Sequence, residues 1–521
     1  MSDKPIWIEQ FARPAGTEIK HIGNHWYLYE RLGVYDKARK RKRKKSGQCL
    51  GAITENGLSP SKRHAPLRGA GPLEIENLEY GATALLLNLT APMRERLALR
   101  FPDCWREIFT LALMKCKEQS HFRRMEFHYR TSFLVQCLKG LSLSAGRVSA
   151  LLRHIGANRE AIRAYMKGDL PDGGLILFDG HRLISGSGTL EYARVGYDSK
   201  CRFLPQVNLL YMFSVLGSRR LPVFYKQCAG DVPDVSALSD IVADAGLRRG
   251  DVTVVADKGF ESEFNESLLE DASLGYVLAI RRGCAGIPEV PAAADRYQKV
   301  FKFRDRAIYC NEYPQERGRL FLYYDMNLAN DEAVDFITRR EKANRTIGKR
   351  REAEDRRRRR NRGRLSQDEY ERLVPVDVAD ALQAHRDNGT FILKTNRDDI
   401  NCVQAYYLYK TRQDIEQAFK SYDDTLDGAA SYMRDQYSFE AWLFVNHLAL
   451  QMLYAVIGAV AEKDLTDRYS FEDIMAFLKH VSANRIDGEW RLTKITKHTA
   501  KLCEELGIEL EAPGKLQVSL K

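Results

Sequence analysis

Three acidic residues stand where folded chains often hold metal ions. Asp179 follows the apolar run Leu-Ile-Leu-Phe and Asp257 follows Val-Thr-Val-Val-Ala, so each is expected at the end of a buried strand. Glu416 lies in residues 409–420, a stretch without Gly or Pro that predicts a helix. Three such carboxylates can hold two Mg²⁺ ions about 3.5–4 Å apart. Each acid alone also fits a plainer role, as a cap on a turn or one half of a surface ion pair.

The predicted helix gathers its polar side chains on one face. At about 100° per residue, Tyr409, Arg412, Glu416 and Lys420 fall within an arc of about 80°. Apolar residues occupy the neighbouring arc and would pack against the rest of the protein. A carboxylate flanked by cations and a phenol suits a site that holds a metal ion and a phosphate together. The alternative is a surface helix with intrahelical salt bridges.

Composition points to a soluble protein with a polyanionic partner. The 521 residues are too many for one compact core and predict about two to four domains. Lys and Arg number 81 against 70 Asp and Glu, a formal charge of +11. The ten cysteines are scattered without Cys-x-x-Cys pairs, and no signal peptide is expected, so we predict reduced thiols in the cytoplasm. The apolar run 441–460 contains Asn446, His447 and Gln451 and predicts a buried helix, with no membrane partner.

The positive charge is concentrated in two runs. Residues 37–45 carry eight basic side chains in nine positions, in a predicted loop between two strands. Residues 336–365 hold 14 Lys and Arg against 4 acids and predict a long helix or a partly disordered segment. Both runs could lie along a phosphate backbone; the alternative is a solvated run of charge.

The order of elements predicts the fold class. From Gly173 onward the patterns indicate strand, hairpin, helix, strand, helix and strand, which is the order of a ribonuclease-H-like core. We therefore expect an α/β protein: a mixed sheet with flanking helices, interrupted by a β-rich and basic insertion, and preceded by a β arm and a helical domain. The expected boundaries are 1–66 for a DNA-binding β-hairpin arm, 67–170 for a helical DNA-binding domain, 171–280 and 389–460 for the two parts of the core, 281–388 for the insertion and 461–521 for a C-terminal helical region.

These motifs together resemble the DDE transposases of bacterial insertion sequences. Within them, the chain is similar to the group with a β-rich insertion and a third motif that reads Tyr-(two)-Arg-(three)-Glu-(six)-Lys. Tyr409, Arg412 and Glu416 match this motif at its spacing, and Ala256-Asp257-Lys258-Gly259-Phe260 matches the second motif. Linking blocks within 196–234 and the opening segments 16–20 and 50–57 also resemble the family. One departure concerns the motif lysine, because its position is Asp423 here and Lys420 lies one turn earlier.

The resemblance implies an enzyme that cuts and joins DNA. Asp179, Asp257 and Glu416 would be both catalytic and metal-binding, with Mg²⁺ as the cofactor and Mn²⁺ as a possible substitute. The partners would be double-stranded DNA, namely the terminal inverted repeats of the element and the target, in a synaptic homodimer in the cytoplasm of a prokaryote. The residues expected to contact DNA are Tyr409, Arg412, Lys420, Lys258, Lys37, Arg39, Lys40, Arg41, Lys42, Arg43, Lys44, Lys45, Arg356, Arg357 and Arg358.

Two alternatives remain open on the sequence. One is a domesticated DNA-binding protein or regulator derived from a transposase, which the loss of an acid would favour. The other is a nuclease on the same fold that cuts without strand transfer, because fold alone does not fix function.

Overall fold

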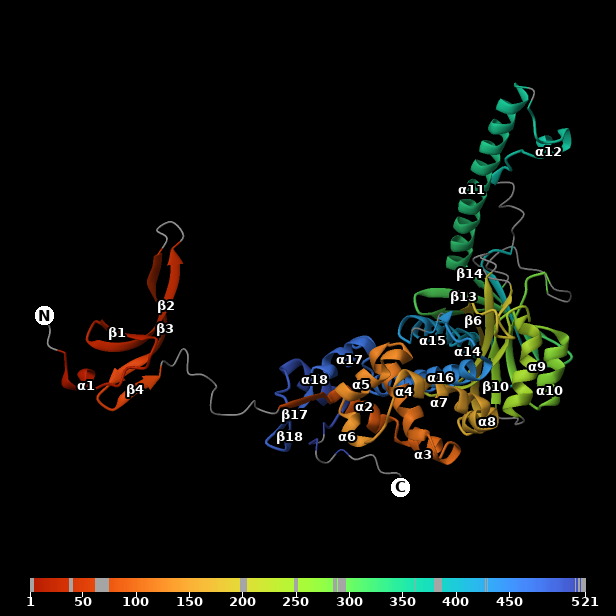
Figure 1. The fold of residues 1–521 in the computed structure, drawn as a ribbon. Helices are drawn as coiled ribbons and strands as arrows, with labels where there is room; N and C mark the ends of the chain where they lie inside the picture. Colours follow the sequence, from red (N-terminus) through yellow and green to blue (C-terminus); the bar gives the residue numbers. More distant parts are fainter. Residues whose placement is uncertain are drawn as a thin grey trace. The chain divides into compact units, whose positions relative to one another are not determined.

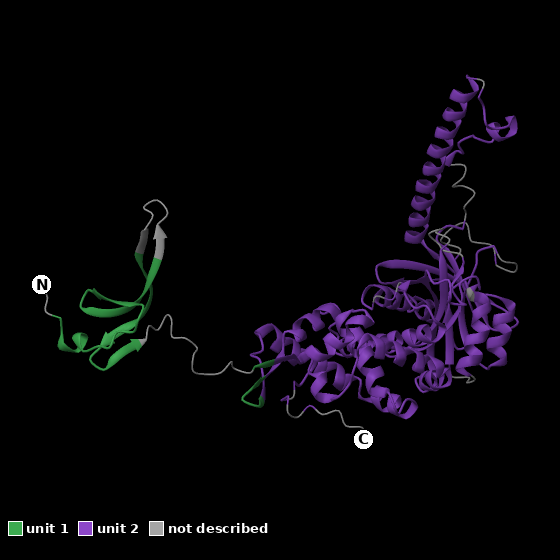
Figure 2. Cartoon of the chain, in the orientation of Figure 1, with its two compact units in different colours: residues 1–76, 485–489 green, residues 77–484, 490–521 purple. Residues whose placement is uncertain are grey.

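A computed structural model describes residues 4–36, 41–60, 75–196, 204–247, 252–283, 288, 297–360, 362–378, 387–426, 428, 430–510, 512–513 and 516. The chain divides into two compact units (Figure 2). The first comprises Met1–Glu76 with Arg485–Glu489, and the second comprises Asn77–Asn484 with Trp490–Lys521.

The first unit is a small antiparallel sheet. Its elements are α1 (Ile6–Glu9), β1 (Thr17–Ile22), β2 (His25–Asp36), β3 (Arg41–Thr54) and β4 (Gly57–Pro60). Ile8, Leu28 and Ile53 form its buried core. The prediction of a loop over residues 37–45 is wrong for residues 41–45, because these residues belong to β3 and pair with residues 32–36 of β2. The strands continue because their backbone groups pair with each other rather than with water; residues 37–40 lie outside the described residues.

The second unit is built on a mixed sheet (Figure 1). Its central strands are β6 (Gly174–Ser185), β8 (Pro205–Leu216), β9 (Arg219–Ala229), β10 (Val252–Ala256) and β11 (Gly275–Ile280). β6, β10 and β11 run parallel, whereas β8 pairs antiparallel with β6 and with β9. Helices α9 (Asp234–Ala245) and α10 (Glu263–Asp271) lie where the sequence predicts them. The predicted order of strand, hairpin, helix, strand, helix and strand is confirmed.

The region predicted as an insertion is not one separate body. β12 (Lys299–Phe303), β13 (Arg306–Pro314) and β14 (Arg319–Asp325) join the same sheet through β15 (Thr390–Thr395), which pairs antiparallel with β11. Two helices of the same region, α11 (Met326–Arg358) and α12 (Gln367–Glu371), form a hairpin, and the helix that the basic run predicts is therefore present. Two short strands, β7 (Arg194–Val195) and β16 (Ala430–Ser431), complete the sheet in the described residues.

Helices from both ends of the second unit pack around one core helix, α16 (Gln436–Ala461). This helix is long and apolar enough to cross a membrane, but 83% of its most apolar window is buried, which confirms the predicted buried helix. α4, α7 and β9 pack against it. At Gly156 of α7 a Cβ atom would lie 1.8 Å from the carbonyl oxygen of Tyr437, so only glycine permits this approach.

The remaining elements of the helical region are α2 (Gly81–Leu89), α3 (Ala91–Arg100), α4 (Trp105–Glu118), η1 (Phe122–Arg124), α5 (Met125–Thr131), α6 (Leu134–Cys137), α7 (Ala145–Ala157), α8 (Arg159–Lys167), α17 (Phe471–Lys479) and α18 (Lys497–Leu506). β5 (Glu76–Glu79), β17 (Ser482–Ile486) and β18 (Glu489–Leu492) form a short sheet.

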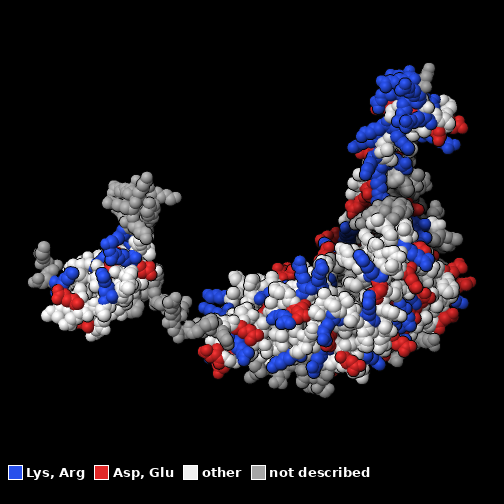
Figure 3. Space-filling view, viewed as in Figure 1, with Lys and Arg blue, Asp and Glu red and all other residues white. Residues whose placement is uncertain are grey.

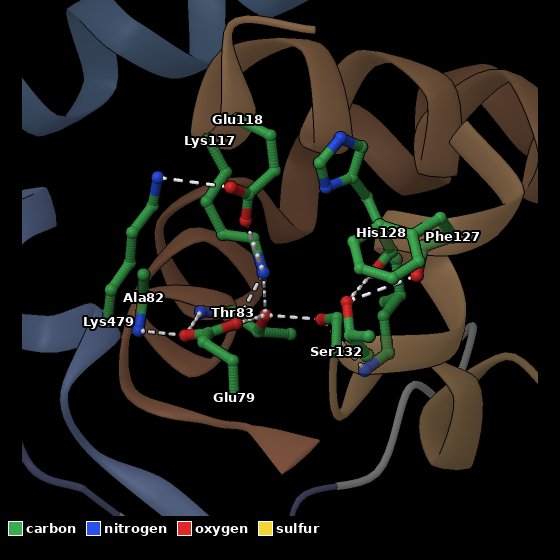
Figure 4. A network of polar contacts seen from close by, with 11 residues as sticks. Glu79, Ala82, Thr83, Lys117, Glu118, Phe127, His128, Ser132 and Lys479 are labelled. Carbon is green, nitrogen blue, oxygen red and sulfur yellow. Dashed lines mark hydrogen bonds and ion pairs between the residues drawn. The ribbon is translucent and has the colours of Figure 1, made fainter. Parts of the chain in front are cut away.

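A buried ionic network ties these helices together (Figure 4). The side chain of Lys117 on α4 is 1% exposed and forms ion pairs with Glu79 and with Glu118. Its ammonium also donates to Thr83 on α2 at 3.1 Å. Lys479 at the end of α17 reaches Glu118 at 3.2 Å. Charges this deep are tolerated only when they are paired and hydrogen-bonded, so the network fixes how α2, α4 and α17 meet.

Candidate active site

Two of the predicted acids come from neighbouring parallel strands. β6 pairs with β10 so that Leu177 stands beside Val255; Asp179 lies two residues further along β6, and Asp257 lies two residues further along the chain, directly after β10. The prediction that both acids end strands is wrong for Asp179, because β6 continues to Ser185. β6 pairs with β8 from Leu175 to Ile184, and Asp179 lies opposite Tyr211 in this pairing. Asp257 does follow the last residue of β10.

The third acid comes from a pair of helices rather than one. α14 (Cys402–Lys410) and α15 (Gln413–Asp424) are separated by a turn at residues 411–412, so the single helix predicted over 409–420 is wrong there. α14 packs against β10, β11, β13 and β15, whereas α15 packs against β6, and the turn lets each helix meet its own strands. Thr411 and Arg412 keep right-handed helical backbone angles. The side chains of Tyr409, Arg412 and Glu416 therefore still face one place.

Arg412 lies at the centre of the three acids. Its Nη1 atom donates to Asp179 Oδ2 at 3.1 Å, and its Nη2 atom donates to Glu416 Oε1 at 2.8 Å. Asp257 Oδ2 is 3.9 Å from the same Nη2 atom. Burial disfavours the charged guanidinium, but Asp179 and Asp257 outweigh it and raise the pKa of Arg412. One guanidinium thus holds together carboxylates from β6, the end of β10 and α15.

The surroundings of the acids differ. Burial raises the pKa of Asp179 to about 6, although Arg412 and the Gly180 amide, which donates to it at 2.9 Å, favour the charged form. The phenol of Tyr409 donates to Asp257 Oδ1 at 2.9 Å. Burial and then Asp257 raise the pKa of Tyr409, so it remains a donor. The side chain of Glu416 is 57% exposed, which makes its side of the cluster the open one.

The chemistry of these donors suits a divalent cation. Three ionised carboxylates and one guanidinium leave a formal charge of −2, and carboxylate oxygens are the ligands that Mg²⁺ prefers. In the part of the chain that the structure describes, however, no three acids, histidines or cysteines are arranged to hold a metal ion. In the geometry shown, Arg412 offsets one of the three negative charges.

A pocket opens beside the cluster and is rich in cations. Asp257, Tyr409 and Arg412 line it together with Phe391, Ile392, Lys258, Arg281, Arg282 and Lys410. Lys258 was predicted as a DNA contact, whereas Arg281, Arg282 and Lys410 were not. A signal for the first two was available, because they directly follow β11, the parallel neighbour of β10. Burial lowers the pKa of Lys410, whose ammonium lies 5.4 Å above the Phe391 ring.

The position that holds lysine in the third motif is Asp423 in this chain. Asp423 Oδ1 lies 2.9 Å from His181 Nε2 on β6, although the two atoms are not aligned for a hydrogen bond. The His181 ring stacks on Phe419 with centroids 4.7 Å apart. Lys420 is exposed on α15. Asp423 therefore faces a histidine, and Lys420 remains available to a ligand.

The predicted DNA contacts elsewhere are distributed over both units. The backbone of Arg41, Lys42, Arg43, Lys44 and Lys45 belongs to β3, and Lys37, Arg39 and Lys40 lie outside the described residues. Arg356, Arg357 and Arg358 form the last turn of α11.

Comparison with known proteins places this site in a family. Residues 172–452 match the family described as "Transposase DDE domain", and the matched range contains Asp179, Asp257 and Glu416. A comparison with curated proteins finds no match. A solved structure described as "Cryo-EM structure of piggyBac transposase synaptic complex with hairpin DNA" is similar over 72% of this chain and 70% of that chain. The two sequences are 13% identical, and the TM-score is 0.35. Because the family match spans more than half of the 521 residues, the chain belongs to the transposase DDE domain family.

Proposed function

We propose that this protein is a DNA transposase that cleaves the ends of a bacterial insertion sequence and joins the freed 3′-hydroxyls to target DNA. The observation that supports the proposal is the convergence of Asp179, Asp257 and Glu416 on the guanidinium of Arg412, within the range that matches the transposase family. These acids come from elements far apart in sequence, and their joint placement suits phosphodiester chemistry better than three separate structural roles.

Each residue of the cluster has a proposed role. Asp179, Asp257 and Glu416 would hold two Mg²⁺ ions, which when bound supply activation of the attacking oxygen and stabilisation of the leaving one. Tyr409 orients the Asp257 carboxylate through its hydrogen bond. Arg412, Lys258 and Lys420 would contact the phosphates of the scissile strand.

The proposed reaction has two chemical steps, whose reactants are water and DNA. In the first, water attacks the phosphorus at the element end, the bond to the 3′ oxygen breaks, and a 3′-hydroxyl and a 5′-phosphate result. In the second, that 3′-hydroxyl attacks a target phosphodiester and forms a new P–O bond. The target's own bond between phosphorus and the 3′ oxygen breaks, and the leaving oxygen becomes a free 3′-hydroxyl. Two ends must react together, so we propose a homodimer in the synaptic complex, acting in the cytoplasm of a prokaryote.

The DNA itself would be held by positive charge outside the cluster. The basic run at 37–45 includes residues 41–45 of β3, and Arg356–Arg360 lie at the end of α11 and directly after it. Phosphate contacts of this kind give affinity without sequence preference and weaken as salt is added.

The test uses the purified full chain and the DNA that flanks the gene on both sides. We expect Mg²⁺-dependent strand cleavage at inverted repeats, and joined products when a pre-cut end is supplied with target plasmid. Asp257→Asn should abolish cleavage and leave DNA binding largely intact. Asp414→Asn is the control, because Asp414 lies on α15 two residues before Glu416 but pairs with Arg220 at 2.7 Å, outside the cluster.

The outcomes separate the alternatives. Cleavage that survives in Asp257→Asn would overturn the assignment of the site. Cleavage without any joined product would indicate a nuclease, and DNA binding without either activity in the unmodified chain would indicate a transposase-derived regulator.

A further inference from the structure

The long helix α11 begins beside the candidate active site. Leu328 and Glu332, in its first two turns, line the same pocket as Asp257 and Tyr409. Glu332 accepts two hydrogen bonds from Arg282, at 3.0 and 2.7 Å. It also accepts from the backbone amide of residue 389 at 2.8 Å. The base of the helix is therefore fixed next to β11 and β15, two strands that line the same pocket.

The helix carries its other end far from the acids. It has 33 residues, which at about 1.5 Å of rise each makes it about 50 Å long. Figure 1 shows it projecting away from the sheet of the second unit. B-form DNA rises about 3.4 Å per base pair, so the helix spans the length of about 15 base pairs.

Charge is distributed unevenly along this helix. Residues 326–347 contain four basic and four acidic side chains, and two of the arginines form i,i+4 ion pairs, Arg339 with Asp335 and Arg345 with Glu341. Residues 348–364 contain ten basic and three acidic side chains. We call residues 348–364 the arginine tip; Figure 3 shows its Lys and Arg side chains gathered at the far end of the helix. We call residues 326–347 the shaft. The shaft has no net formal charge, and the arginine tip has a formal charge of +7.

The arginine tip is a folded structure. Glu354 is 1% exposed and accepts the backbone amides of Arg364 at 2.8 Å and Leu365 at 3.1 Å, which closes the chain over the end of the helix. The guanidinium of Arg358 lies 4.2 Å from the centroid of the Tyr370 ring. Arg358 therefore packs on Tyr370 within the hairpin of α11 and α12, and the positive charge available to a ligand belongs to the neighbouring arginines.

Several of those neighbours are open to solvent. Between residues 356 and 364, the exposed arginines that have no ion pair with any described acid are Arg356, Arg359, Arg360, Arg362 and Arg364. Five like charges on one small surface repel one another unless an anion neutralises them. Guanidinium groups bind phosphates well because their donors match phosphate oxygens in pairs.

We infer that the arginine tip is a second contact to the duplex whose scissile phosphate lies at Asp179, Asp257 and Glu416, about 15 base pairs from that phosphate. This inference rests on the proposed function. The neutral shaft leaves the intervening base pairs without strong contacts. Binding affinity should therefore increase only when the duplex is long enough to reach the arginine tip. The phosphates could belong to the element end or to the DNA on the other side of the cut, and both present the same chemistry.

Duplexes of graded length test this inference. The scissile position is fixed, and the duplex is lengthened from 5 to 30 base pairs in steps of 5, first on the element side and then on the other side. Binding to the full chain is measured in EDTA, so that it does not depend on cleavage. We expect affinity to rise at least tenfold between 10 and 20 base pairs on one side only, and that side identifies the source of the phosphates.

Two variants, each with four substitutions, compare the arginine tip with the rest of α11. Arg356→Ala, Arg359→Ala, Arg360→Ala and Arg362→Ala together should remove the length step and lower the salt slope by up to about 3.6. The shaft variant replaces Arg339, Arg340, Lys342 and Arg345 by Ala, and it should keep the step. Circular dichroism on both variants checks that the helix is retained.

Three results would overturn the inference: a step that persists in the tip variant, a step lost equally in the shaft variant, or no step at all in the unmodified chain. Failure of the proposed function is a separate outcome, because it appears as absent cleavage at every length whatever the binding curve shows.

Discussion

Arg412 and Asp179 are separated by 233 residues in the sequence, yet the guanidinium of one donates to the carboxylate of the other at 3.1 Å. The same guanidinium reaches Glu416 and Asp257. Arg412 therefore acts as an internal counter-ion for three acids that would otherwise repel one another across a partly buried site. A divalent cation and Arg412 would compete for the same carboxylate oxygens.

Replacing Arg412 tests this competition. In Arg412→Gln the acids lose their counter-ion, so the metal-free protein should have a lower Tm, and Mn²⁺ should raise that Tm by more than it does in the unmodified protein. Strand cleavage should fall, because Arg412 is also a proposed phosphate contact. The measurement is thermal unfolding with Mn²⁺ and with EDTA. An equal rise in Tm for both proteins would show that Arg412 does not compete with the metal.

Lys420 is the cation on α15 that is available to DNA. Lys420→Met should weaken DNA binding and reduce the slope of log affinity against log salt by about 0.9, as expected for the loss of one phosphate contact. Asp423→Asn is the companion variant, because it removes the negative charge that faces His181 and should strengthen binding. Unchanged salt slopes in both variants would exclude this part of α15 from the DNA path.

The buried network at Lys117 predicts a stability effect. Lys117→Met leaves Glu79 and Glu118 without their ammonium partner, and removal of one member of a buried pair costs roughly 3–5 kcal/mol. Lys479→Met is the control at the edge of the same network, where the side chain is 34% exposed and the expected cost is about 0–1 kcal/mol. Urea unfolding of both variants gives the comparison; a smaller loss for Lys117→Met than for Lys479→Met would contradict the assignment.

His447 predicts how stability depends on pH. It is fully buried on α16 with Nδ1 2.9 Å from the Tyr211 hydroxyl, and burial, followed by Arg96, lowers its pKa to about 3. The unfolded chain titrates near its ordinary value of about 6.5 and binds a proton that the folded protein refuses. Stability is therefore retained above pH 6.5 and is lost as pH falls toward 3, at up to about 1.4 kcal/mol per pH unit.

The check compares urea unfolding at pH 6.0 and pH 5.0 in the unmodified protein and in His447→Gln, which keeps an acceptor for Tyr211. The variant should be less stable at both values but should lose less between them. Identical losses in the two proteins would show that another group dominates this pH range.

Much of the core could be predicted from sequence because its signals are local. Apolar runs located β6, β8, β10 and β11, and helical periodicity placed α10 at the observed residues Glu263–Asp271. The end of β6 could not be predicted, since its continuation to Ser185 depends on pairing with β8. The turn at Thr411 was hidden for the same reason: nothing in the local sequence breaks the helix, and the break follows from packing on different strands.

The sequence by itself determined which residues could do the chemistry: acids after apolar runs, a basic run on a helix, and a third motif with its tyrosine, arginine and glutamate at fixed spacing. Only the tertiary structure decided that Arg412 lies among all three acids, that Asp423 faces His181, and that the strands β12–β14 join the main sheet. Residue type and helical spacing are properties of short segments, whereas these contacts join residues up to 242 positions apart, as for His181 and Asp423, and exist only once strand pairing has set the register.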